Sequence, residues 1–125
     1  MKIGIDYGRT INRHPEVFSK LTKWLRQSGH QIYIISGRNY GKFSGDNIEK
    51  QVVDSLKESL SKYHTEYDYI TPHDDRLHTD IDKGKGKQCK EYGIDIMFDD
   101  DDGYINDIKR WSPNTEIIKV KNENL

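Results

Sequence analysis

The sequence is poor in cysteine and in long apolar segments. Cys89 is the only cysteine among the 125 residues, so the chain cannot form an internal disulfide, and no second cysteine stands at a metal-ligand spacing. No apolar run is long enough to cross a bilayer, and the first residues lead directly into a strand pattern rather than into a signal peptide. These absences predict a cytoplasmic protein with no membrane partner.

Net charge and apolar content are both low. Twenty Lys and Arg residues face 21 Asp and Glu residues, for a formal net charge of −1, so the composition does not support general binding to nucleic acid or to an acidic membrane. Hydrophobic residues make up only 33% and charged residues also 33%, which predicts a thin core under a well-solvated surface. Clear apolar periodicity and the low net charge argue against disorder.

Apolar strand patterns alternate with amphipathic helix patterns along the whole chain. Short apolar runs predict strands at residues 2–5, 32–35, 67–70, 94–98 and 116–120. Between them, helix patterns begin at Pro15 and near Asp46, and shorter ones cover residues 83–92 and 104–111. Such alternation is typical of a parallel sheet that is covered by helices on both faces.

The predicted fold is therefore α/β, a Rossmann-like three-layer sandwich with a central, mainly parallel sheet of about five strands. We expect a single domain over residues 1–120 and a short frayed tail over residues 121–125. The first strand should lie centrally, with the strands ending at Ile35 and Phe98 near or beside it. Ligands of such sheets bind outside the carboxyl ends of the strands, so these ends should hold the site.

Polar residues follow three of the predicted strands, at residues 6–10, 36–39 and 99–102. The last segment is four consecutive aspartates, which would repel one another unless a cation lay among them. A hard divalent ion such as Mg²⁺ takes one or two carboxylates together with waters and phosphate oxygens. The alternative is that Asp101 and Asp102 are solvated loop residues and that Asp99 or Asp100 caps the following helix.

The combination of these segments resembles the haloacid dehalogenase-like (HAD) superfamily over nearly the whole chain. The first family motif, Asp-x-Asp-Gly-Thr after a strand, is matched in part by Asp6-Tyr7-Gly8-Arg9-Thr10, and the second, a strand ending in Ser or Thr, is matched by Ser36. The third motif is a lysine at the start of a helix, for which Lys87 is the first choice and Lys83 the second. The fourth, a strand ending in two aspartates, is matched by Asp99-Asp100.

The resemblance implies a phosphatase or phosphotransferase chemistry. Asp6 would be the nucleophile, Asp6, the Gly8 carbonyl, Asp99 and Asp100 would hold Mg²⁺, and Ser36 and Lys87 would bind phosphoryl oxygens, with Thr10 as the motif threonine. The chain lacks the second Asp of the first motif, the general acid/base, because Gly8 stands there. Activity should therefore be weak, and Arg9, where the family has Gly, either binds an anion or blocks the site.

Neither of the two places where family members carry a cap insertion is long enough here to hold one. In this family, an open, capless site goes with macromolecular substrates or with oligomers. We therefore expect the partner to be a phosphorylated small molecule or the phosphate end of a macromolecule. A homo-oligomer is also possible. Two alternatives remain. One is a catalytically degenerate HAD-like binding or regulatory module, and the other is an RNase H-like metal-dependent nuclease, which the opening residues 3–8 also resemble and which requires an antiparallel first strand pair.

Overall fold

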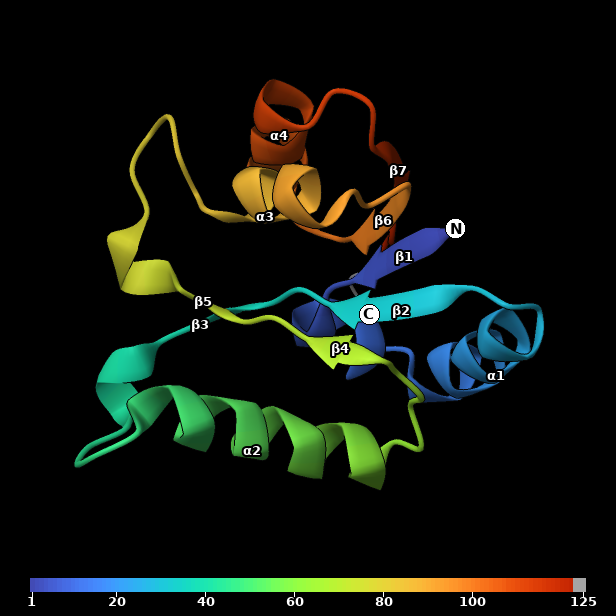
Figure 1. Cartoon of the computed structure of the whole chain (residues 1–125), viewed down its shortest axis with the longest axis horizontal. Helices are drawn as coiled ribbons and strands as arrows, with labels where there is room; N and C mark the ends of the chain where they lie inside the picture. The colour runs from blue at the N-terminus through green and yellow to red at the C-terminus, as the bar shows by residue number, and fades with distance from the viewer. Residues whose placement is uncertain (123–125) are drawn as a thin grey trace.

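The computed structural model describes residues 1–122, and its centre is a five-stranded sheet with all strand pairs parallel (Figure 1). The strand order is β4-β2-β1-β6-β7. The strands span β1 Lys2–Ile5, β2 Gln31–Ile34, β4 Tyr69–Ile70, β6 Ile96–Asp99 and β7 Glu116–Lys119. The predicted α/β architecture and the central position of the first strand are confirmed, and the parallel pairing of β1 with β2 excludes the hairpin that the RNase H-like alternative needs.

Helices cover both faces of this sheet. Figure 1 shows α2 (Ile48–Lys62) below the strands and α1 (Pro15–Gln27) to their right, with α3 (Lys85–Tyr92) and α4 (Asp102–Trp111) toward the top. From β1 the chain moves outward through β2 to β4, and it then returns to the other side of β1 through β6 to β7. The strand order therefore reverses beside β1, which is where parallel sheets open a crevice for ligands.

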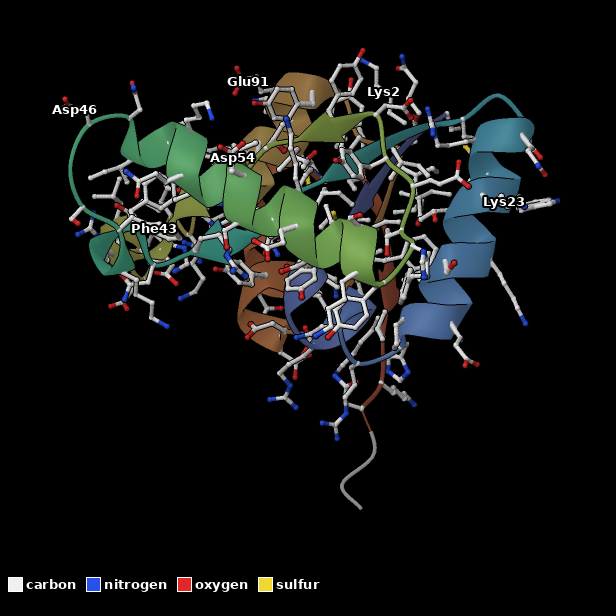
Figure 2. All side chains as sticks on the ribbon, turned by 90° about the horizontal axis from the view of Figure 1, so that it is seen from below. Lys2, Lys23, Phe43, Asp46, Asp54 and Glu91 are labelled. Atoms are coloured by element: carbon white, nitrogen blue, oxygen red, sulfur yellow. The ribbon has the colours of Figure 1, made fainter. Side chains whose placement is uncertain are left out.

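The two layers of helices enclose two apolar clusters because strand residues alternate between the faces. Ile32 and Ile34 pack with residues of α1 and α2, whereas Tyr33 and Ile35 pack with residues of α3 and α4. Charged side chains such as Lys23 on α1 and Asp54 on α2 point outward in Figure 2. An apolar cluster thus lies between the sheet and each pair of helices, and charged side chains lie on the outer surface of the helices.

Three helix ends differ from the predicted ones. α2 begins after Asn47, and its predicted N-terminal signal at Asp46 makes no side-chain cap. α4 begins two residues earlier than predicted, because Asp101 caps it by accepting a hydrogen bond from the Tyr104 amide at 3.0 Å. The alternative in which Asp99 or Asp100 caps this helix is therefore wrong. α3 begins at Lys85, two residues later than predicted.

The sequence pattern did not predict a second, two-stranded parallel sheet, β3 (Gly37–Arg38) with β5 (His73–Asp74). It continues the directions of β2 and β4 beyond the central sheet (Figure 1). The connection from β1 to β2 holds α1 and a short turn, and that from β4 to α3 holds only β5 and a single 3₁₀ turn, so residues 1–122 contain no cap domain. No helix in this range could cross a membrane.

Candidate metal and phosphate site

Three carboxylates meet at the carboxyl ends of the two central strands. Asp6 follows β1, Asp99 ends β6 and Asp100 follows it, and each offers an oxygen atom that lies within 4.8 Å of the others. The Asp6 amide donates to the Phe98 carbonyl at 3.0 Å, which ties the two strand ends together. We call these three residues the acidic cluster, and they lie close enough to share one cation or to perturb one another.

A buried lysine lies inside the acidic cluster. The Lys85 side chain is fully buried, and its Nζ lies 2.6 Å from Asp99 Oδ2 and 3.1 Å from Asp6 Oδ1. The ammonium also stands 3.9 Å from the centroid of the Tyr104 ring, a cation–π distance. The other Asp99 oxygen, Oδ1, accepts the Asp101 amide at 3.0 Å, so each oxygen of this carboxylate has one partner and keeps a further acceptor site. The innermost charges are thus paired and hydrogen-bonded, as buried charges must be.

Burial and charge pull the pKa values of this cluster in opposite directions. Burial raises the pKa of Asp6, the Lys85 ammonium lowers it and Asp99 raises it again, with a net result of about 7. Burial by itself would lower the pKa of Lys85, but Asp6 and Asp99 together raise it above its ordinary value. Lys85 therefore stays protonated at neutral pH.

The lysine at the cluster is not the one that the sequence pattern favoured. Lys87 pairs with Asp82, and its Nζ lies 4.5 Å from the Trp111 ring centroid. A helix turns about 100° per residue, so with α3 beginning at Lys85, Lys87 projects roughly 200° away from it. Lys83, the second choice, precedes the helix and donates its amide to Asp107. Three lysines alternate with other residues here, and only the true start of the helix distinguishes them.

The loop after β1 forms a kinked turn over Tyr7–Ile11. Thr10 is buried, and its Oγ1 lies 3.5 Å from Asp100 Oδ1. Gly8 has an extended backbone, and a Cβ built there would meet no atom within 4 Å. Arg9 has a left-handed backbone with φ 58°, and its amide donates to Asn12 Oδ1 at 2.6 Å. Position 8 thus has free space for a side chain, whereas position 9 has a backbone that favours glycine.

Asp100 forms the outer wall of the cluster. The Arg9 Nε lies 3.4 Å from Asp100 Oδ2, although the Arg9 side chain is 72% exposed. Asn122 donates to the Arg9 carbonyl at 2.8 Å and lies 3.4 Å from the same Asp100 oxygen. Burial and the neighbouring Asp99 raise the pKa of Asp100. Asn122, from the segment predicted to fray, therefore contacts this wall, and residues 123–125 of that segment lie outside the described residues.

The remaining predicted residues divide between the site and the surface. Ser36 lies two residues beyond the end of β2, the strand next to β1, and is 2% exposed. Its carbonyl accepts the His73 amide at 3.1 Å. Of the four consecutive aspartates, the first two enter the acidic cluster. Asp101 caps α4, and Asp102 pairs with Lys119 on the surface.

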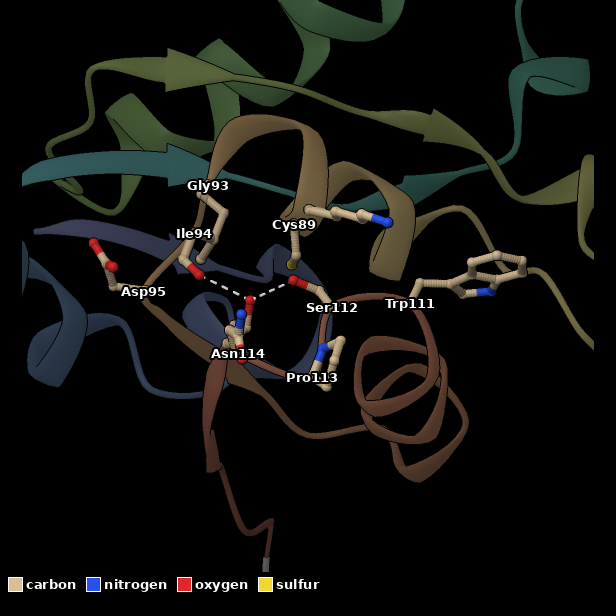
Figure 3. Close-up of a pocket in the computed structure, with 10 residues that line it drawn as sticks. Cys89, Gly93, Ile94, Asp95, Trp111, Ser112, Pro113 and Asn114 are labelled. Atoms are coloured by element: carbon tan, nitrogen blue, oxygen red, sulfur yellow. Dashed lines mark hydrogen bonds between the residues drawn. The ribbon is translucent and has the colours of Figure 1, made fainter.

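A separate hollow of about 450 Å³ lies between the end of α3 and the turn that follows α4 (Figure 3). Its polar groups satisfy one another: Thr115 Oγ1 donates to the Ile94 carbonyl at 2.8 Å and lies 2.7 Å from Ser112 Oγ. Cys89 is buried beside it, and burial raises the pKa of this thiol to about 12. Since a thiol with that pKa is not nucleophilic at neutral pH, the hollow offers no reactive group.

Comparison with solved structures finds a protein of the same fold. No protein-family model matches the chain, and no curated protein matches it. A solved structure described as the Pnkp1/Rnl/Hen1 RNA repair complex contains a chain that superposes on 95% of this one with a TM-score of 0.63 and 17% sequence identity. Our chain spans 42% of the length of that neighbour. At this identity, the likeness shows that the two share a fold.

Proposed function

We propose that this protein is a Mg²⁺-dependent, HAD-like phosphatase or phosphotransferase that acts through Asp6 on a phosphate-bearing substrate. The observation that carries the proposal is the acidic cluster with the Lys85 ammonium inside it, at the point where the strand order reverses. Transfer of a phosphoryl group requires carboxylates that hold a metal ion or attack phosphorus, and a nearby cation that stabilises the negative charge of the phosphoryl oxygens.

The donor set fits a hard divalent cation. Asp6, Asp99 and Asp100 offer carboxylate oxygens within 4.8 Å of one another, and no softer ligand takes part in this cluster. These three residues would hold Mg²⁺, together with the Gly8 carbonyl that the resemblance implies. When bound, Mg²⁺ supplies positive charge that offsets the negative charge developing on the transferred group.

The residues of the chain would carry the reaction in two steps. The Asp6 carboxylate attacks phosphorus as the bond to the leaving oxygen breaks, which leaves an aspartyl-phosphate that water then hydrolyses or that an acceptor alcohol takes up. The Lys85 ammonium and the Ser36 hydroxyl would donate hydrogen bonds to phosphoryl oxygens. Lys85 remains charged in this role because the two carboxylates raise its pKa.

Turnover should be weak because nothing at position 8 can transfer a proton. A general acid protonates the leaving oxygen and a general base activates the water, and such catalysis typically contributes about 10² to 10⁴ in rate. Glycine has no side chain to do either. Substrates whose leaving oxygen needs no protonation should suffer least from this loss.

For the substrate, we favour the phosphate end of a nucleic acid over a free small molecule. Two observations support this: the capless architecture over residues 1–122 leaves the strand ends without a covering domain, and the structural neighbour belongs to an RNA repair complex. The net charge of −1 gives no general affinity for nucleic acid, so recognition would concentrate on the terminal phosphate.

The second candidate is a binding or regulatory module that has lost turnover. It is favoured by Gly8 and by the ion pair between Arg9 and Asp100, in which a side chain already neutralises one carboxylate of the cluster. In that case Mg²⁺ and phosphate would still bind, but no phosphoester would be hydrolysed.

Thermal melting with and without Mg²⁺ tests the metal site directly. Mg²⁺ should raise the melting temperature of the wild type, because folding gathers the acidic cluster and the unfolded chain does not. Asp99→Asn should lose this effect, whereas Asp102→Asn, a surface aspartate paired with Lys119, should keep it. Equal shifts in wild type and Asp99→Asn would refute metal binding at this site.

Turnover of a 3′- or 5′-phosphorylated oligonucleotide, compared with a generic phosphomonoester, then separates the two candidates. A magnesium-dependent melting shift with hydrolysis supports the enzyme, and hydrolysis should favour the oligonucleotide. The same shift without any hydrolysis supports the binding module.

A further inference from the structure

Asp107 is a buried carboxylate that the proposed chemistry does not use. It lies on α4 and is 5% exposed. Its two oxygens accept from backbone amides on either side of Lys85: Oδ1 from the Lys83 amide and Oδ2 from the Gly86 amide, both at 2.8 Å. A carboxylate buried with only backbone partners must contribute to the position of the segment that it holds, because leaving either amide unpaired would be costly.

The segment held by Asp107 is the beginning of α3. Gly84, at the N-cap position, has φ 79° and no side-chain cap, so α3 lacks the usual local acceptor for its first amides. Asp107, on the neighbouring helix α4, supplies the missing acceptor. Its negative charge lies at the N-terminus of α3, which is the positive end of the helix dipole. A Cβ on Gly86 would collide with the Asp107 carbonyl and crowd Trp111, so glycine lets the two helices approach closely enough for these bonds.

The same face of α4 also covers the lysine side chain. Tyr104 precedes Asp107 by one helical turn, and its ring lies 3.9 Å from Lys85 Nζ. α4 therefore restrains Lys85 at both ends, with Asp107 holding the backbone and Tyr104 the ammonium. Lys85 has two carboxylate partners at 2.6 and 3.1 Å, and both contacts depend on where the first residue of α3 stands.

We infer that Asp107 is a positioning residue, which places the Lys85 ammonium between Asp6 and Asp99 by fixing the start of α3. The effect of this positioning on turnover rests on the proposed function. The positioning of Lys85 does not, because it concerns the protein without substrate. Asp107→Asn is the informative change. The amide keeps one acceptor oxygen and turns its NH₂ group toward a backbone donor, so α3 must shift at its first turn.

The test follows the side-chain ammonium by NMR of protein labelled with ¹⁵N-lysine. Lys85 is the one fully buried lysine among residues 1–122, so it should give a single ammonium signal protected from water, absent in Lys85→Met. In Asp107→Asn, this signal should move and its hydrogens should exchange with water about tenfold faster or more, since opening of the contact governs exchange. Asp102→Asn removes the same charge from the exposed side of the same helix and should leave the signal unchanged.

A kinetic cycle measures the consequence for turnover. Asp107→Asn should lower kcat/KM for a phosphomonoester about tenfold, because misplacement of a charge-stabilising group is costly, and should lower it less than about twofold when Lys85 is already Met. An unchanged ammonium signal, or the same loss in both backgrounds, would overturn the inference. Should Asp107→Asn fail to fold, Asp107→Ser, which also keeps one acceptor, takes its place. If the wild type shows no turnover, the proposed function fails, but the ammonium signal still decides the positioning.

Discussion

The inner and outer halves of the site are built in opposite ways. The inner half, Lys85 with Asp99 and Asp6, is buried, and its charges are paired at 2.6 and 3.1 Å. The outer half, Gly8 and Arg9, is open: position 8 has no neighbour within 4 Å, and the Arg9 side chain is 72% exposed. Under the proposed function, the inner half has the groups that would bind charge, whereas Gly8 gives the outer half no side chain for proton transfer, so binding and turnover should be separable.

The largest effect should come from completing the outer half. Gly8→Asp should raise hydrolysis of a generic phosphomonoester by roughly 10² or more, because it restores a general acid/base. The backbone there has φ −65° and ψ 126°, which any residue adopts, and a Cβ at this position meets no atom within 4 Å. Steady-state kinetics with Mg²⁺ measure the gain, and Arg9→Gly is added if the long side chain occupies the space.

Asp6→Asn in the Gly8→Asp background is the control, and it should abolish the gain because an amide is a far poorer nucleophile than a carboxylate. A wild type that already hydrolyses phosphomonoesters as fast as Gly8→Asp would show that another residue supplies the proton, and the contrast between the two halves would disappear.

Removing the central charge of the inner half should have an effect of comparable size, on stability instead of on rate. Lys85→Met leaves two buried carboxylates without their cation and should lower the free energy of unfolding by about 3–5 kcal/mol, measured by urea denaturation without Mg²⁺. The matched control is Lys87→Met, two residues away, where the ammonium is half exposed and the loss should stay below about 1 kcal/mol. Similar losses in the two variants would mean that the inner half is not held by its charges.

A third, pH-dependent effect comes from His73, beside the inner half. Burial lowers the pKa of His73 to about 4, and the nearby Lys85 ammonium adds to this, against an ordinary value of 6.5. As the pH falls from 6.5 toward 4, His73 is therefore protonated in the unfolded chain before it is protonated in the folded protein. The free energy of unfolding should fall by at most about 3 kcal/mol across that window. Above pH 6.5 this contribution is constant.

The His73 effect is measured as the difference in unfolding free energy between wild type and His73→Phe at several pH values. The carboxylates titrate in both proteins, so their contribution cancels in this difference. What remains is the His73 contribution, which should change the difference by at most about 3 kcal/mol between pH 7 and pH 4. A difference that does not change with pH would show that His73 is protonated as easily in the folded protein as in the unfolded chain.

The smallest effect concerns the backbone of the outer half. Arg9 has φ 58°, and a left-handed conformation costs a residue with a Cβ about 1–2 kcal/mol. Arg9→Gly should therefore be more stable than Arg9→Ala by about 1 kcal/mol, since both lose the ion pair with Asp100 and only glycine relieves the strain. Thermal or urea unfolding of the two variants makes the comparison, and equal stabilities would mean that the turn relaxes around alanine.

Much of the site followed from one-dimensional patterns. Short apolar runs that end in polar residues predicted parallel strands, and because parallel strands end at a common edge, Asp6, Ser36 and Asp99 were expected to lie together there. The structure brings Asp6 and Asp99 together and places Ser36 two residues beyond the end of β2, the strand next to β1. The roles of these residues in binding or catalysis remain predictions.

What the sequence by itself determined is the order of strands and helices, the central place of β1 and the convergence of the strand ends, because each depends on local periodicity and on the rules of parallel sheets. Only the tertiary structure decided which lysine enters the acidic cluster. A shift of two residues in where α3 begins turns a different side chain inward, and that beginning is set by Asp107, 22 residues further along the chain, through bonds to the amides of Lys83 and Gly86.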